Sequence, residues 1–189
     1  GSYLAYTCIW GMTTASLYVY VTYASLMAVN LWGMGIRSFS FVFSCVPFGM
    51  IGGMLINRFL GPRLGIVKML RVGLVMEVLF ILLVIYALQL EGLSRAALFF
   101  AGMFGVYLCT PVVSSNATFL GIEHSTDRSI GSSLMGCLNL IVTTAALFIV
   151  RAMPTDGELI LDKVFVCHAF LLAFLLLWQL KFSSSSSNS

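Results

Sequence analysis

The chain has 189 residues, of which 60% are hydrophobic and 9% are charged, and its formal net charge is +3. A soluble domain carries roughly 25% charged residues, and a chain this short could not bury so much apolar surface away from water. The composition therefore predicts an all-α membrane protein whose outer surface faces lipid, and the ten scattered Lys and Arg residues argue against nucleic-acid binding.

Six apolar stretches reach the length of about 20 residues that a membrane-crossing helix needs. No charge precedes Arg37, so the first span starts near the beginning of the chain. We expect closed helices, because lipid cannot hydrogen-bond an open backbone. Residues 1–182 are expected to form one six-helix transmembrane bundle, followed by a disordered Ser-rich tail at 183–189. The expected spans are residues 3–26, 39–56, 66–90, 96–120, 130–150 and 159–180.

The basic residues between the spans predict an orientation in the membrane. Successive spans run in opposite directions, so alternate loops lie on the same side. The side with more Lys and Arg is cytoplasmic by the positive-inside rule, which places both chain termini there. Six basic residues fall on that side: Arg58, Arg63, Lys68, Arg71, Arg128 and Lys181. Four fall on the other side: Arg37, Arg95, Arg151 and Lys163.

The cysteines carry no recognisable chemistry. All five lie far apart in apolar runs, and none forms a Cys-x-x-Cys pair. They are expected to behave as small buried hydrophobic residues. The sequence therefore predicts no disulfide framework, no metal site and no cofactor.

The strongest local pattern follows the second span. Gly49 and Gly53 lie one helical turn apart, which makes a smooth face for close helix packing. Arg58 and Arg63 can reach a helix end or a partner carboxylate at the cytoplasmic edge, where they would latch one conformation. The alternative is that these basic residues only anchor the helix ends by the positive-inside rule.

This segment, from Gly53 to Arg63, resembles the short basic loop of the major facilitator superfamily. That loop follows a Gly-x-Leu-x-Asp-Arg pattern closed by a glycine and basic residues. Asn57 stands where the pattern has an acidic residue, and one extra residue precedes Gly61. The resemblance implies a conformational latch whose charged part is weakened in this chain.

A second pattern strengthens the resemblance. Ser115-Asn116-Ala117-Thr118 leads through a polar loop to a helix start rich in small residues, 128–136, with Asn139 one turn later. This looks like the region between the tenth and eleventh helices of Bcr/CflA-type (bicyclomycin and chloramphenicol resistance) drug exporters. That family usually places a proline next to the asparagine, whereas the nearby proline here is Pro111. Residues 3–182 together resemble the C-terminal half of such a transporter, one bundle made of two three-helix repeats.

The resemblance implies that the first, second, fourth and fifth spans line a central cavity and that the third and sixth are peripheral. An apolar pocket with a few hydroxyls suits amphiphilic, drug-like molecules, and aromatic faces can hold a cation. Packing between helices is the alternative role for each candidate. The candidates are Trp10, Thr14, Tyr18, Phe41, Ser44, Phe48, Tyr107, Thr110, Asn139 and Thr143.

Glu77 is the one carboxylate well inside a span, roughly 9 Å deeper than Arg71 at the helical rise per residue. An ionisable residue inside the membrane is a candidate proton site. A purely structural, hydrogen-bonded carboxyl is the alternative. His168, in the last span, is expected to be a packed histidine.

By resemblance, the chain is expected to export drug-like or small amphiphilic molecules by proton-coupled alternating access, in the bacterial inner membrane. That mechanism needs a second bundle, either a missing N-terminal six-helix half or a second copy, in addition to lipid, substrate and protons. One alternative is a metabolite importer of the same superfamily. Another is a stand-alone six-helix protein, such as an assembly factor or a rhomboid-like protease that uses Ser133 and His168. Leu134 follows Ser133 where such a protease wants glycine, so no enzyme activity is expected.

Overall fold

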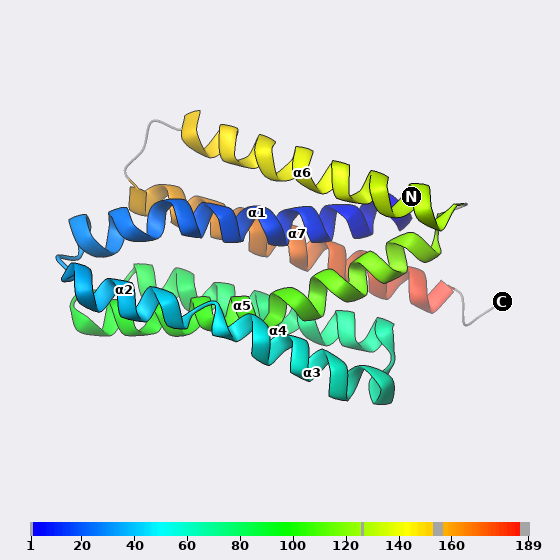
Figure 1. Ribbon diagram of the computed structural model, residues 1–189, viewed down its shortest axis with the longest axis horizontal. Coiled ribbons are helices and arrows are strands. Elements are labelled where there is room, and N and C mark those ends of the chain that lie inside the picture. Colours follow the sequence, from blue (N-terminus) through cyan, green and yellow to red (C-terminus); the bar gives the residue numbers. More distant parts are fainter. Residues whose placement is uncertain (1, 126, 153–156, 186–189) are drawn as a thin grey trace.

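The computed structural model describes residues 2–125, 127–152 and 157–185, and this part of the chain folds entirely into helices. Seven α-helices and one π-helical segment follow one another with short connections (Figure 1). They are α1 (Ser2–Ser25), η1 (Leu26–Leu31), α2 (Ile36–Cys45), α3 (Phe48–Leu64), α4 (Ile66–Leu88), α5 (Leu93–Glu123), α6 (Arg128–Ala152) and α7 (Gly157–Ser185).

Within the described ranges, five helical segments are long and apolar enough to cross a membrane. They are Tyr3–Val29, Ile36–Leu64, Ile66–Leu88, Ser94–Glu123 and Arg128–Ala152. These segments contain four of the first five predicted spans, and the third, predicted as residues 66–90, ends two residues earlier at Leu88. The sixth, residues 159–180, falls within α7, a helix of 29 residues whose first and last side chains lie outside the described residues. The sixth crossing and the superfamily-type bundle stay predictions.

The second predicted span, residues 39–56, is divided into two helices. Helix α2 ends at Cys45, and α3 begins at Phe48 after Pro47. Proline has no backbone N–H and its ring crowds the preceding turn, so it interrupts the helix at this position. The second connecting loop, predicted around 58–65, is also shorter than expected. Helix α3 continues through it to Leu64, and only Gly65 separates α3 from α4.

Two smaller boundaries differ from the prediction as well. The first span does not end at residue 26, because the chain continues as the π-helix η1 to Leu31. Helix α7 continues to Ser185, into the segment that was predicted to be disordered from residue 183. The rest of that tail, 186–189, lies outside the residues that the structure describes.

Successive long helices run in opposite directions, so alternate helix junctions lie at the same end of the bundle. The beginning of α1, the α3–α4 junction, the α5–α6 junction and the end of α7 all lie at one end (Figure 1). The η1–α2 and α4–α5 junctions lie at the other end. The loops that carry most basic residues therefore share one side, as the positive-inside argument requires.

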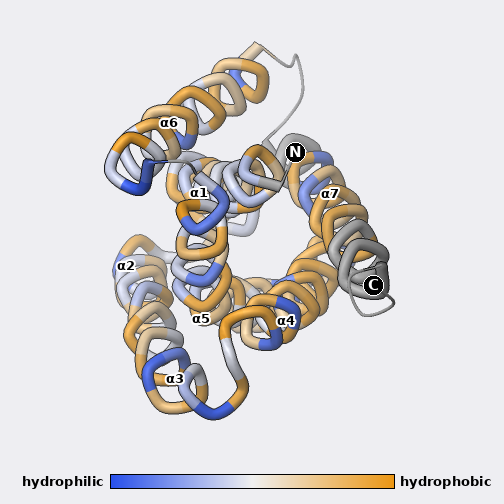
Figure 2. The backbone as a smooth tube through the Cα atoms, turned by 90° about the vertical axis from the view of Figure 1, so that its right-hand side faces the viewer, coloured by the Kyte–Doolittle hydropathy of each residue, from blue (hydrophilic) through white to orange (hydrophobic). Residues whose placement is uncertain are grey.

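Helix α5 forms the centre of the bundle and packs against α1, α3, α4 and α6. Seen along the helices, α4 and α7 lie on one side, while α6 and the α2–α3 pair lie at two separate edges (Figure 2). Helices α1 and α5 lie between those edges. This arrangement leaves one face where α1 and α5 form the floor, with α3 and α6 as its margins.

Aromatic side chains fill the end of the bundle opposite the α3–α4 junction. Tyr20 packs against Phe43, Phe99 and Tyr107, with ring centroids 5.6, 6.1 and 5.8 Å away. Trp32 meets Phe99 edge to face at 5.1 Å. Such pairs add stability beyond the apolar area that they bury. The cluster joins α1, α2 and α5 and closes this end of the bundle.

Candidate functional site

Helix α1 presents a row of polar and aromatic side chains to the open face. Trp10, Thr14, Tyr18 and Thr22 follow one another at intervals of four residues, which places them on one side of a helix. The Thr14 hydroxyl donates to the carbonyl of Trp10 (2.9 Å), and the Thr22 hydroxyl donates to that of Tyr18 (2.8 Å). Each hydroxyl is thus partly satisfied by its own helix and keeps acceptor capacity for another molecule.

Helix α5 contributes a matching row, Tyr107, Thr110, Ser114 and Thr118, at intervals of three and four residues. The Thr110 hydroxyl donates to the Val106 carbonyl at 2.9 Å. The first three residues of each row line a cavity of about 350 Å³ that is bounded on its third side by Met50 of α3.

A second cavity of about 370 Å³ continues from the first and shares Trp10 and Ser114 with it. Ser115 and Thr118 of α5 line this second part. We call the two cavities together the α1–α5 groove. The central part of the groove lies near the middle of both helices. Residues 14–18 are close to the midpoint of α1 and η1 together (2–31), and residues 107–114 are close to the midpoint of α5 (93–123).

The predicted cavity residues fall into three groups. Five of them line the α1–α5 groove: Trp10, Thr14, Tyr18, Tyr107 and Thr110. Phe41, Ser44 and Phe48 are exposed on α2 and α3 and do not line it. Asn139 and Thr143 are buried where α6 packs on α1, and neither side-chain oxygen has a hydrogen-bond partner.

Sequence reasoning missed Met50, Ser114, Ser115 and Thr118. The repeat of small polar residues along α5 is a signal that could have found the three hydroxyl residues, because their spacing continues the row from Tyr107 and Thr110. Met50 follows the helix interruption at Pro47, so its direction depends on a bend that hydropathy does not reveal.

The opposite side of the bundle has a different surface. Along the middle of α4 the exposed side chains are all apolar: Val72, Val75, Met76, Leu79 and Leu82. Along the described part of α7 the large exposed hydrophobic side chains are Phe170, Phe174 and Leu177, and Lys163 is exposed nearer the start of the helix. This surface suits contact with lipid chains, and the contrast with the groove gives the bundle two distinct faces.

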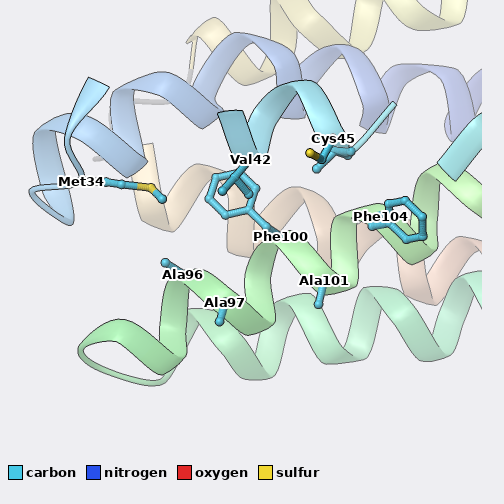
Figure 3. A pocket seen from close by; sticks show the side chains of 9 residues that line it. Met34, Val42, Cys45, Ala96, Ala97, Phe100, Ala101 and Phe104 are labelled. Carbon is cyan, nitrogen blue, oxygen red and sulfur yellow. The ribbon is translucent and has the colours of Figure 1, made fainter. Parts of the chain in front are cut away.

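A third cavity, of about 390 Å³, lies between α2 and the first half of α5. Figure 3 shows Val42 and Cys45 of α2 on one side and Ala97, Phe100 and Phe104 of α5 on the other. All of its lining side chains are apolar. It offers no polar group to orient a solute, so the α1–α5 groove is the better candidate site.

The two glycines of the loop motif allow α3 to approach α5. A Cβ atom added at Gly49 would lie 2.6 Å from the carbonyl oxygen of Phe104, and one at Gly53 would overlap the carbonyl oxygen of Leu108. Backbone-to-backbone contact of this kind is how small residues join membrane helices. The groove therefore has a firmly packed α3–α5 margin.

The two sequence patterns meet at the next turn. Asn116 donates to the side-chain oxygen of Asn57 (2.7 Å) and to the Val112 carbonyl (2.6 Å). Asn57 in turn donates to the Ser115 hydroxyl (2.9 Å), which donates to the Pro111 carbonyl. Asn57 thus binds α5. Gly61, Arg58 and Arg63 follow toward the end of α3, and both arginines are exposed.

We expect Asn57→Leu to lower the free energy of unfolding by about 1 kcal/mol, because interhelical hydrogen bonds in membranes contribute about that much. Asn57→Asp serves as the matched control, since a carboxylate still accepts the bond from Asn116. Unfolding by SDS, followed by circular dichroism, measures both. Equal loss in the two variants would contradict a role for the Asn116 bond.

The structure also places Glu77, the predicted proton site, and the two residues of the protease alternative, Ser133 and His168. Glu77 is fully buried and does not line the groove. Ser133 is exposed on α6 and donates to the Ser129 carbonyl (3.2 Å), whereas His168 is buried and contacts Ser16 and Glu77. The Ser133–His168 pair that a protease would need is therefore not formed.

The chain matches no protein-family model, no curated protein and no solved structure. The resemblance to the major facilitator superfamily therefore rests on the sequence patterns alone. The part of the chain that the structure describes is helical, with five segments suited to crossing a membrane.

Proposed function

We propose that this bundle is one half of a two-bundle transporter that moves small amphiphilic molecules across a membrane by alternating access. The observation that carries the proposal is the two-sided surface. Hydroxyl and aromatic side chains line a groove at mid-depth on the α1–α5 face, while the α4 and α7 side is apolar. Polar groups at that depth are normally turned toward protein or a water-filled cavity rather than toward lipid.

In this proposal a second bundle covers the groove. The second bundle is either another part of the same polypeptide or a second copy of the chain. Substrate sites of such transporters lie near the bilayer midplane between two bundles, which rock around the bound molecule. The depth of the α1–α5 groove fits that position, and the superfamily-type patterns around Asn57 and Asn116 support the same reading.

The groove also favours a substrate class. Trp10, Tyr18 and Tyr107 provide aromatic faces, and Thr14, Thr110 and Ser114 provide hydroxyls. None of the lining residues is charged. Aromatic faces attract organic cations and apolar rings, whereas an anionic metabolite would lack a basic partner. We therefore place export of neutral or cationic drug-like molecules above import of carboxylates or sugar acids.

The remaining parts of the proposal follow from the resemblance and the charge distribution. Proton exchange drives export, and the protein resides in a plasma membrane, bacterial by the resemblance. Both chain termini face the cytoplasm, at the end of the bundle that carries most basic residues.

Ethidium, a fluorescent amphiphilic cation, provides a direct test. We expect Tyr18→Ala to weaken ethidium binding to the purified protein about tenfold, which corresponds to about 1.4 kcal/mol. The matched control is Phe170→Ala, which removes an exposed aromatic ring at similar depth on the opposite side. Binding is measured by fluorescence anisotropy, and ethidium accumulation is measured in cells expressing the protein at full length.

The two variants separate the outcomes. Weaker binding and higher accumulation with Tyr18→Ala, but not with Phe170→Ala, support export through the groove. Equal effects of both variants, or accumulation that does not depend on expression of the protein, would count against it.

A further inference from the structure

Four polar side chains meet inside the bundle where α1, α4 and α7 pack together. Glu77 of α4 and His168 of α7 are 0% exposed, and Ser16 and Thr13 of α1 are buried with them. The His168 Nε2 atom lies 3.8 Å from a Glu77 carboxyl oxygen. Its Nδ1 atom lies 2.6 Å from the Ser16 hydroxyl. The cluster lies behind α1 as seen from the groove, so it is separate from the candidate substrate site.

The carboxyl group of Glu77 is poorly satisfied in this position. Among the described residues, neither of its oxygens makes a well-formed hydrogen bond, although the Thr13 hydroxyl lies beside the carboxyl group, and His168 Nε2 also lacks one. An ionised carboxylate without hydrogen bonds is costly in a water-free interior. Such a group is stable when it holds a proton or when a neighbouring cation compensates its charge, and the 3.8 Å gap to His168 is short enough for a small shift to form that contact.

The Ser16 hydroxyl can exist in two arrangements. It lies 3.0 Å from the Met12 carbonyl and 2.6 Å from His168 Nδ1, and it has a single proton to donate. When it donates to Met12, His168 Nδ1–H must donate to it, and Nε2 faces Glu77 with a lone pair. When it donates to His168 Nδ1, Nε2 carries the imidazole proton and faces Glu77 as a donor.

These two arrangements differ by one proton on the Glu77–His168 pair. In the first, Glu77 is a neutral acid that faces the lone pair of Nε2, and the pair has no net charge. In the second, Glu77 is a carboxylate that faces Nε2–H, and the pair has a charge of −1. Removing the proton from the pair therefore reverses the direction of the Ser16 hydroxyl bond, because His168 remains neutral but changes tautomer.

The other titratable groups near the pair do not replace either partner. Cys109 of α5 is buried within electrostatic range of Glu77. Arg71 lies on α4 six residues before Glu77, roughly 9 Å away along the helix. Helix α3 carries its charges, Arg58 and Arg63, at its exposed end. Helix α1 contributes only the hydroxyls of Thr13 and Ser16 to the cluster.

Helix α1 connects this cluster with the groove. Thr13 and Ser16 point to the cluster, whereas Thr14 and Tyr18, their neighbours along the same helix, line the groove. A change in the bonds that hold α1 against α4 and α7 therefore acts on a wall of the groove directly.

We propose that Glu77 and His168 form a proton-binding pair inside the bundle and that the Ser16 bond transmits its protonation state through α1 to the groove. The link from this pair to the groove rests on the proposed function. It deepens that function by giving the coupled proton a site in this bundle. On protonation, a proton that comes from water is gained at His168 Nδ1, beside the Ser16 hydroxyl, while the Nε2 proton passes to the Glu77 carboxylate; deprotonation reverses both transfers.

The protonation of Glu77 is tested first, by infrared difference spectroscopy of the purified full chain between about pH 4 and about pH 9, a range that covers exposed and buried carboxyl groups. We expect a carbonyl band of a protonated carboxylic acid that persists above the titration of surface carboxylates, disappears reversibly at higher pH, and is missing in Glu77→Gln. Glu123→Gln, which changes an exposed carboxylate at the end of α5, is the control and keeps the band.

The band also tests the partners of Glu77. Ser16→Ala is expected to change the proton affinity of the pair about threefold to tenfold, because a buried hydrogen bond to His168 is lost. Ser133→Ala, which removes an exposed hydroxyl of α6 outside the groove, is the control and leaves the titration unchanged. Identical titrations in the wild-type chain and Glu77→Gln would overturn the proposal, and so would a Glu77 that is always protonated or always ionised over this range.

The link to the groove is tested with ethidium. We expect its affinity for the wild-type protein to change about tenfold across the titration of the band and to become independent of pH in Glu77→Gln. If the band titrates but ethidium affinity does not follow it, the relay through α1 is wrong. If ethidium does not bind at any pH, the transporter proposal fails, and the infrared titration still decides whether Glu77 and His168 bind a proton.

Discussion

Gly53→Ala is expected to lower the free energy of unfolding by about 3 kcal/mol, the upper part of the range for overpacked sites. The added methyl group would overlap the Leu108 carbonyl oxygen and lie 2.6 Å from a ring carbon of Pro111. A backbone carbonyl cannot rotate away as a side chain can, so α3 and α5 would have to separate. Thermal unfolding in detergent, followed by circular dichroism, measures the loss.

Gly52→Ala provides the control on the adjacent residue. A Cβ atom there would lie 3.7 Å from the Leu108 side chain, which is an ordinary contact. Both variants replace a helical glycine by alanine, so both gain the same helix propensity. If Gly53→Ala were as stable as Gly52→Ala, the close α3–α5 contact would not exist in the protein.

Phe170→Arg is expected to remove most of the protein from the membrane, while Tyr18→Arg is expected to be tolerated. A charge at the centre of a lipid-facing helix costs about 2.5–3.5 kcal/mol on insertion scales. Phe170 is 74% exposed on α7 and Tyr18 is 52% exposed on α1, and both lie near the middle of their helices. The two substitutions therefore differ mainly in the face of the bundle that they occupy.

The amount of full-length protein in the membrane fraction, and its elution as a single species from a sizing column, measure this effect. Leu82→Arg on α4 repeats the test on the apolar side, where Leu82 is exposed. Equal loss with Tyr18→Arg and Phe170→Arg would mean that the groove faces lipid, and the assignment of the two faces would then be wrong.

Hydropathy alone predicts most of the fold of this chain. The first five spans follow from the lengths of the apolar stretches and from the placement of charges between them. The interruption at Pro47 and the helical course from Arg58 to Leu64 were not predicted. Proline and glycine signal a helix break both at Pro47 and near Pro62. Only tertiary packing decides that the helix is interrupted at Pro47 and continues through Pro62.

The candidate site was predictable only in part. Trp10, Thr14 and Tyr18 show a spacing of four residues, so their common face can be read from the sequence. The rotation of α2 after η1 decides where Phe41 and Ser44 point, and no local pattern encodes it. His168 is packed, as the sequence predicted, but its contact with Ser16 was not predicted because it joins residues 152 positions apart.

The single residue between α3 and α4 limits how this bundle can move. Gly65, at φ +81°, is the whole connection, and one extended residue spans at most about 3.6 Å. A slide of one helix past the other by a full turn would need about 5.4 Å. Helices α3 and α4 are therefore tied in register, and both are packed on α5. We therefore expect any large displacement within the chain to involve helices other than α3, α4 and α5.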